Sequence, residues 1–134
     1  DSQSYITFLN VKTGDTIWRK ERDEPSCWAT PIVVEHEGVE QLITNAHNRV
    51  RSYDLANGDL IWECGGQVSN VTPSPVTDGS HVWVMTGTGI LKAFDFAGEE
   101  IWTRDIQADY GDFGNRRVGQ DYIFHLRRVN VLAT

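Results

Sequence analysis

Apolar residues occur in short runs separated by turn-forming residues, and no stretch has the i, i+3, i+4 apolar spacing of an amphipathic helix. One run, at residues 81–85, is almost wholly apolar, which predicts an inner strand with both faces covered. Gly-containing turns at residues 37–38 and 78–79 follow short apolar runs at residues 32–34 and at residue 76. The pattern therefore predicts an all-β chain.

A five-residue phrase that ends in tryptophan occurs three times along the chain, at residues 14–18, 58–62 and 98–102. The tryptophans lie 44 and 40 residues apart, a period typical of solenoids, propellers and arrays. Each period predicts four short strands and no helix, and four-stranded units of about 40 residues are propeller blades. The predicted fold class is therefore all-β: a partial β-propeller of about two and a half to three blades, each of four antiparallel strands.

The strands of the two complete units are predicted from shared landmarks. Each unit begins with a hydroxyl residue followed by a proline, at residues 30–31 and 74–75. Proline is tolerated there because the first residue of an edge-type strand needs no N–H for the ladder. The later strands are predicted at residues 41–44, 49–54 and 61–62 of the first unit, and at residues 81–86, 90–95 and 101–102 of the second.

These units place one partial propeller domain over residues 1–134. We expect half a blade at residues 5–20, full blades at 29–63 and 72–104, and a divergent tail at 105–134. Known propellers have about four to eight blades, so a fragment of a longer protein or a truncated product is expected. The tail loses the repeat, which leaves two hypotheses: a divergent end, or a reading-frame change in the source sequence.

The residues around the tryptophans resemble the PQQ-repeat (pyrroloquinoline-quinone repeat) family, also called quinoprotein-like propellers. Blades of that family end in Ala, any residue, Asp, two residues, Thr, Gly, three residues and Trp. The matching residues are Ser52, Asp54, Asn57, Gly58 and Trp62, then Ala93, Asp95, Gly98 and Trp102 with one turn residue deleted, and Asn10, Thr13, Gly14 and Trp18 in the first copy. The resemblance covers about residues 5–104 and implies that each tryptophan packs between neighbouring blades.

The resemblance implies a structural, blade-docking role for the residues that recur most often. A tryptophan ring buries roughly 150–250 Å² at such a junction and still has an N–H to satisfy. The turn glycine supplies a positive φ, and the aspartate accepts backbone N–H groups in the turn. The residues predicted to act in this way are Trp18, Trp62, Trp102, Gly14, Gly58, Gly98, Asp54 and Asp95.

Charge and composition exclude some classes of function. The net charge is −7 and the isoelectric point is near 4.9, which argues against a nucleic-acid partner. No apolar run approaches the roughly 20 residues of a membrane-spanning helix, so no transmembrane segment is predicted. Cys27 and Cys64 match no zinc signature, and both a disulfide between neighbouring repeats and two buried free thiols stay open.

Side chains that could bind a metal show no ligand spacing. We expect His36 and His47 in turns, His81 at the start of a strand and His125 in the tail, in structural or solvent-exposed roles. No catalytic residue and no metal site is predicted. Two groups of carboxylates are expected to form solvated loops rather than calcium sites: Glu35, Glu37 and Glu40, and Glu21, Asp23 and Glu24.

The favoured function is a non-catalytic scaffold of the bacterial cell envelope that binds other proteins. In this respect the chain looks like the outer-membrane assembly lipoproteins, which use the same repeat without PQQ. The resemblance implies a periplasmic or secreted protein, or a lipid-anchored one, whose partners include the remaining blades of the parent propeller. Tyr110 and Phe113 in the tail are the predicted contacts with a partner.

The alternative function is a fragment of a PQQ- and calcium-dependent alcohol or sugar dehydrogenase. The site of those enzymes uses an adjacent Cys-Cys pair, a calcium-binding Glu and Asn, and a catalytic Asp. None of these residues can be placed on this sequence, so no cofactor is predicted and the balance favours a protein that is not an enzyme. A third hypothesis is a propeller fused to a sensor or kinase module.

Overall fold

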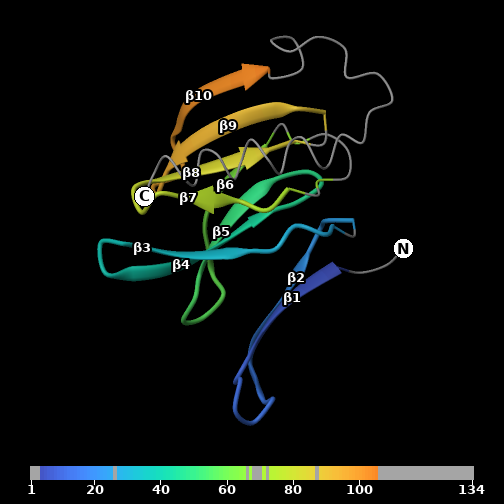
Figure 1. The fold of residues 1–134 in the computed structure, drawn as a ribbon. Coiled ribbons are helices and arrows are strands. Elements are labelled where there is room, and N and C mark those ends of the chain that lie inside the picture. Colours follow the sequence, from blue (N-terminus) through green and yellow to red (C-terminus); the bar gives the residue numbers. More distant parts are fainter. Residues whose placement is uncertain are drawn as a thin grey trace.

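The computed structural model describes residues 4–25, 27–65, 67, 71, 73–86 and 88–105. Within these residues the chain forms ten strands and no helix, arranged in three sheets (Figure 1). The strands are β1 (Ser4–Leu9), β2 (Thr16–Arg22), β3 (Ile32–His36), β4 (Val39–Asn45), β5 (Val50–Asp54), β6 (Leu60–Cys64), β7 (Val76–Thr77), β8 (His81–Met85), β9 (Ile90–Asp95) and β10 (Glu100–Asp105).

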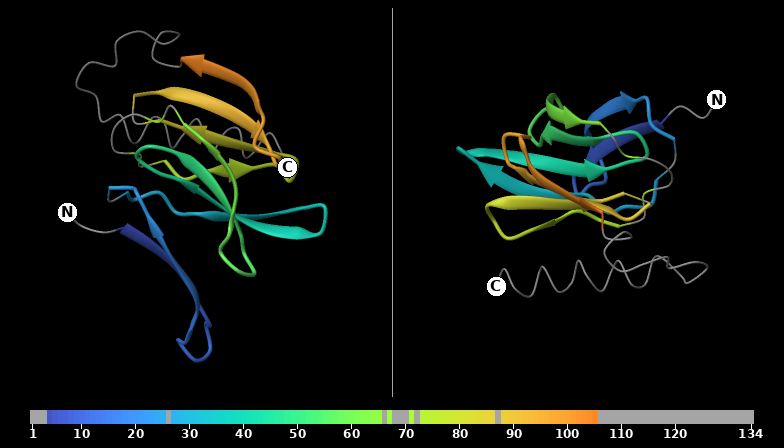
Figure 2. Two further views of the ribbon diagram at one scale, coloured as in Figure 1. Left: turned by 180° about the vertical axis from the view of Figure 1, so that it is seen from behind. Right: turned by 90° about the horizontal axis from the view of Figure 1, so that it is seen from above.

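Strands that follow one another in the chain are neighbours within each sheet. β1 pairs with β2, the second sheet has the order β3-β4-β5-β6, and the third runs from β7 to β10. Every pairing is antiparallel. The sheets succeed one another in chain order from β1 to β10, and the view from behind in Figure 2 shows the same order. The predicted all-β chain with four-stranded antiparallel units is confirmed.

One hydrophobic core joins the second and third sheets. Its fully buried members, which include Ile43, Val50 and Phe94, come from both sheets. A second, smaller buried cluster lies within the third sheet. Ile32 and Cys64 pack against it from the side. Since apolar burial is the dominant favourable term in folding, these two sheets are expected to fold as one unit.

The inner position predicted for residues 81–85 is confirmed. β8 lies between β7 and β9 in the third sheet. Val82, Val84 and Met85 are fully buried, whereas His81 and Trp83 are partly exposed. One face of this strand is therefore completely covered and the other is covered in part.

The predicted turn at residues 37–38 is confirmed, but the expected place of His36 is wrong. Glu37 and Gly38 both have positive φ, at 52° and 80°, and they alone connect β3 to β4. Such a two-residue turn lets the strands pair up to its edge, so His36 pairs with Val39 as the last residue of β3. The imidazole packs edge-on against Phe96, with 6.0 Å between ring centroids.

Candidate functional site

Trp18 on β2 reaches across to the second sheet. Its indole Nε1 donates a hydrogen bond to the carbonyl of Leu55 at 2.8 Å, and its side chain is buried. A β-carbon placed on Gly58 would lie 2.7 Å from Cε3 of the Trp18 ring. Because Gly58 also has a φ of +77°, both the backbone conformation and the ring require glycine at this position.

Trp62 makes the same contact one sheet further along the chain. Its Nε1 donates to the carbonyl of Phe96 at 3.1 Å and to Oε1 of Gln41 at 3.2 Å. A β-carbon on Gly98 would lie 2.6 Å from Cγ of Trp62. The second and third sheets therefore meet through the same tryptophan and glycine positions as the first and second.

The two aspartates lie in the turns that carry these glycines. Oδ1 of Asp54 accepts the backbone N–H of Ala56 at 2.8 Å. Oδ1 of Asp95 accepts the N–H groups of Ala97 and Glu99, both at 2.9 Å. Each carboxylate thus satisfies backbone donors within its own turn, which fixes the loop that the tryptophan ring covers.

Among the described residues, two of the predicted positions lack such a partner, and they lie at opposite ends of the array. Gly14 has the same φ of +77° as Gly58, but no atom of the described residues lies within 4 Å of a β-carbon placed on it. Trp102 on β10 is 41% exposed, against 9% for Trp62. Of the three copies of the repeat, the structure therefore brings together the first tryptophan with the second glycine, and the second tryptophan with the third glycine.

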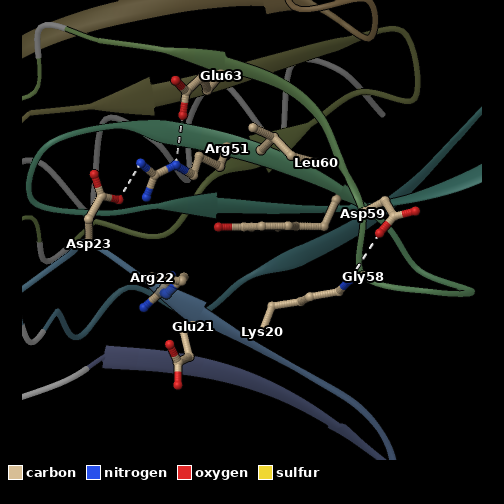
Figure 3. Close-up of a pocket in the computed structure, with 10 residues that line it drawn as sticks. Lys20, Glu21, Arg22, Asp23, Arg51, Gly58, Asp59, Leu60 and Glu63 are labelled. Carbon is tan, nitrogen blue, oxygen red and sulfur yellow. Dashed lines mark hydrogen bonds and ion pairs between the residues drawn. The ribbon is translucent and has the colours of Figure 1, made fainter.

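A cavity of about 420 Å³ opens beside the junction of the first two sheets (Figure 3). It lies between β2 and the pair formed by β5 and β6, so that residues far apart in the sequence line it together. Its lining is strongly charged and consists of Lys20, Glu21, Arg22, Asp23, Arg51, Tyr53, Gly58, Asp59, Leu60 and Glu63.

Arg51 is the centre of an ion network in this cavity. Its side chain is 9% exposed and donates to three carboxylates: Asp23 at 2.6 Å, Glu24 at 3.1 Å and Glu63 at 2.9 Å. Figure 3 shows Asp23 and Glu63 on either side of the guanidinium. Arg49 donates to the other oxygen of Glu63. Since all three carboxylates contact the same planar fork of N–H donors, the network fixes the connection after β2 against β5.

The sequence of this sheet array matches a known protein family. Residues 1–118 match the family described as outer membrane protein assembly factor BamB. The chain belongs to the BamB family. The resemblance to PQQ-repeat propellers drawn from the sequence is therefore confirmed.

Solved structures support the same fold. The chain is similar to the crystal structure of BamB from Moraxella catarrhalis, with a TM-score of 0.67 and 20% sequence identity. The alignment covers 87% of this chain and 35% of the BamB chain, so the present chain spans about a third of that protein. The predicted partial β-propeller is confirmed by this likeness. No curated protein matches the chain.

Electrostatics in this BamB-family chain follow from the Arg51 network. The hydrogen bond from Arg51 lowers the pKa of the Asp23 carboxyl. Burial would lower the pKa of Arg51, but its bonds to Glu63 and Asp23 outweigh burial and raise it, so the guanidinium stays charged. Burial raises the pKa of the Tyr53 phenol, which keeps this neighbour neutral near pH 7. The ion pair between Arg51 and Asp23 is therefore fully charged at neutral pH.

The network corrects one sequence-based expectation for this BamB-family chain. Glu24 was expected to be solvated, but its side chain has no exposed surface. Its Oε2 accepts the backbone N–H of Asn48 at 2.8 Å while its Oε1 accepts Arg51. Two strong donors compensate for the burial of the charge. Of the other acidic residues, Asp23 is exposed but paired with Arg51, and Glu35, Glu37 and Glu40 are exposed.

The two cysteines lie in separate places as free thiols. The Cys27 thiol donates to the carbonyl of Asn45, and that of Cys64 donates to the carbonyl of Gly98, both at 3.2 Å. The thiols are therefore free, as one of the two alternatives has it, but both are only partly buried rather than buried. The sequence has no adjacent cysteine pair, since Cys27 and Cys64 are 37 residues apart.

The other candidate residues are histidines, possible metal ligands and residues of the tail. Within the described part of the chain, no three His, Cys, Asp or Glu side chains are gathered so that they could hold a metal ion. His47 lies in the bend between β4 and β5, and His81 begins β8, as predicted. Tyr110, Phe113 and His125 lie outside the described residues, as does nearly all of the predicted tail. None of the described residues belongs to a helix long and apolar enough to cross a membrane.

Proposed function

We propose that this chain is part of a BamB-type propeller that binds other proteins as a non-catalytic scaffold in the bacterial cell envelope. The observation that carries the proposal is the match of residues 1–118 to the BamB family. That family is described as an outer membrane protein assembly factor, so the proposed partner is a protein of the outer-membrane assembly machinery. The proposed location is the periplasm, with a lipid anchor on the parent protein.

Within this proposal the repeated residues build the scaffold and bind no ligand. Trp18 and Trp62 dock neighbouring blades, at residues 29–63 and 72–104, through their contacts with Gly58 and Gly98. These contacts support the role because each ring is buried and each indole N–H is satisfied by a carbonyl of the next sheet. The surface loops are then left for binding, as is common for rigid scaffolds.

The residue that we propose as a contact with the partner is Trp28. It lies in the connection between β2 and β3, and its side chain is 67% exposed. The equivalent position of the next repeat holds Thr72, so the fold does not require tryptophan there. Tryptophan is enriched among the residues that carry most of the energy of protein interfaces. An exposed indole on a connecting loop therefore fits a protein partner.

A photo-crosslinking amino acid placed at residue 28 tests the proposal in the bacterial host. We expect a covalent adduct with a protein of the outer-membrane assembly machinery, and no such adduct from the same probe at Val33. Val33 is the control because its side chain is also exposed, at 50%, but lies on the edge strand β3 instead of a connecting loop. Probes at Tyr110 and Phe113 test the predicted contacts of the tail in the same experiment.

Two results would overturn the proposal. Adducts formed equally from residues 28 and 33, or with no protein of the assembly machinery, would reject the proposed contact and partner. Oxidation of an alcohol or sugar by the purified protein, dependent on added PQQ and calcium, would reject the non-catalytic role. Because the first result concerns binding and the second concerns chemistry, the two failures are distinguishable.

A further inference from the structure

The charged cavity between β2 and the pair of β5 and β6 holds an arginine whose donors are not satisfied. Nε of Arg22 is buried, and none of the described residues accepts a hydrogen bond from it. Its Nη2 donates to Oγ of Ser4 at 3.4 Å, a long contact with a neutral acceptor. No carboxylate of the described residues lies within 4.0 Å of the guanidinium. A buried donor without an acceptor is costly, so a bound acceptor would stabilise this site.

The other cations that line the cavity already have carboxylate partners. Nζ of Lys20 donates to Asp59 at 2.9 Å, and Arg51 is bound by three carboxylates. Glu21 is the neighbour of Arg22 on β2, but successive side chains of a strand point to opposite faces. Figure 3 shows the Glu21 carboxylate pointing away from Arg51. Arg22 is therefore the cation of this lining that can take up an added anion.

Tyr53 adds a second donor to the same cavity. Its side chain is 5% exposed and lines the cavity together with Arg22. Burial raises the pKa of its phenol, and the nearby guanidinium groups of Arg22 and Arg51 lower that pKa by less. The phenol thus keeps its proton near pH 7 and can donate it in a hydrogen bond. Arg22 and Tyr53 together offer N–H and O–H donors to one acceptor.

Docking of the sheets does not require either of these polar groups. Counted from the repeated tryptophans, the residue of the next repeat that corresponds to Arg22 is Gly66. Counted from the repeated aspartates, the residue that corresponds to Tyr53 is Phe94, which has no hydroxyl. The guanidinium and the phenol thus occur together at the first junction and are both absent from the corresponding positions of the second. This pairing favours a ligand over a structural requirement of the array.

We propose that this cavity binds an organic monocarboxylate, with its carboxylate held by Arg22 and Tyr53. The planar fork of N–H donors on a guanidinium matches a carboxylate. A doubly charged anion is disfavoured because Asp23 and Glu63 line the same cavity. The volume of about 420 Å³ lies in the usual range of small-molecule sites, and Leu60, which is 50% exposed, offers an apolar wall. The inference does not depend on the proposed function.

The test follows the Nε–H signals of the arginines by NMR in the ¹⁵N-labelled chain at pH 7. The probes are sodium butyrate, acetyl-glycyl-glycine and inorganic phosphate. We expect the Arg22 signal to shift and saturate with both carboxylates, and to need at least tenfold more phosphate. Butyrate represents a free small molecule and the peptide represents a chain terminus, so the probe that binds more tightly identifies the source of the carboxylate.

Three variants separate the site from its surroundings. Arg22→Lys keeps the charge but loses the fork of donors, and it should weaken binding at least tenfold, followed at the ring signals of Tyr53. Tyr53→Phe loses one hydrogen bond and should weaken binding about fivefold, followed at Arg22. Arg19→Lys is the matched control because Arg19 lies on the same strand, with its guanidinium 3.7 Å from the ring centroid of Tyr5. This control should bind the carboxylates like the wild type.

Three results would overturn the proposal. They are an Arg22 signal that does not saturate with either carboxylate, equal shifts at Arg19 and Arg22, and phosphate that binds more tightly than both carboxylates. The first result would leave water as the acceptor of the buried N–H, and the second would mean non-specific attraction of anions. Because the titration of the wild type needs no substitution, loss of folding in a variant cannot imitate any of these results.

Discussion

The contact between Trp62 and Gly98 makes a quantitative prediction about two glycines of the third sheet. Gly98 and Gly79 have nearly the same backbone conformation, with φ at +89° and +91°. A β-carbon on Gly98 would lie 2.6 Å from Cγ of Trp62, whereas one on Gly79 would have none of the described part of the chain within 4 Å. Replacing each by alanine therefore imposes the same backbone strain but only one steric clash.

The expected losses of stability follow from these two terms. Placing an L-residue in the left-handed region costs about 1–2 kcal/mol, which applies to both variants. Forcing extra volume into a packed site costs about 1–3 kcal/mol more, which applies to Gly98→Ala alone. We therefore expect Gly98→Ala to lower the free energy of unfolding by about 2–5 kcal/mol and Gly79→Ala by about 1–2 kcal/mol.

Urea titration followed by tryptophan fluorescence and by circular dichroism measures the difference, provided that both probes give one coincident transition. The control for two-state behaviour is an unchanged dependence of the free energy on urea concentration in both variants. A difference between the two variants below about 0.5 kcal/mol would refute the reasoning, because the clash would then cost less than overpacking does. It would mean that Trp62 can move away from the turn without loss.

Three further predictions concern the junctions. Trp62→Ala should destabilise the fold by about 3–5 kcal/mol, and a loss below about 1 kcal/mol in a urea titration would reject its docking role. Arg51→Ala should cost about 3–5 kcal/mol because it leaves the buried carboxylate of Glu24 without its cation, while Arg49→Ala at the exposed edge should cost less than about 1 kcal/mol in the same assay. The lowered pKa of Asp23 means that its contribution to stability is present above its unfolded-state pKa and is lost as the pH falls through its folded-state pKa. The urea midpoints of wild type and Asp23→Asn should therefore differ at pH 7 and converge in acid, and a constant difference would contradict the assignment.

The sequence was sufficient to predict the sheets because the signals for them are local. Proline before β3 and β7 and the two-residue turn after β3 determine where strands begin and end without reference to distant residues. The period of about 40 residues then allows the strand boundaries predicted in one unit to be checked against those of the other, because both units should have the same strands. His36 was misplaced because a tight turn leaves its flanking residues in the strands, which a turn signal alone does not show.

The charged cavity could not be predicted from the sequence in the same way. Arg51 faces Glu63 across β5 and β6, and the register of that predicted hairpin could have suggested this pair. Glu24 reaches Arg51 from a connection 27 residues earlier in the chain. That contact depends on how two sheets pack against each other, which no local pattern specifies. The burial of the Glu24 side chain could therefore be seen only in the structure.

A comparison of the two complete sheets argues that the Arg51 network is structural. Arg51 on β5 and Lys92 on β9 occupy the same position of the repeat. Nζ of Lys92 donates to the carbonyl of Gly65, in the connection that leads into its own sheet, as Arg51 binds the connection after β2. A cation at this position thus ties the incoming connection to the third strand in both sheets. Because the device recurs, the cavity around Arg51 follows from building the array. Under the proposed function, a partner-specific role is therefore expected of residues that differ between repeats, such as the exposed Trp28.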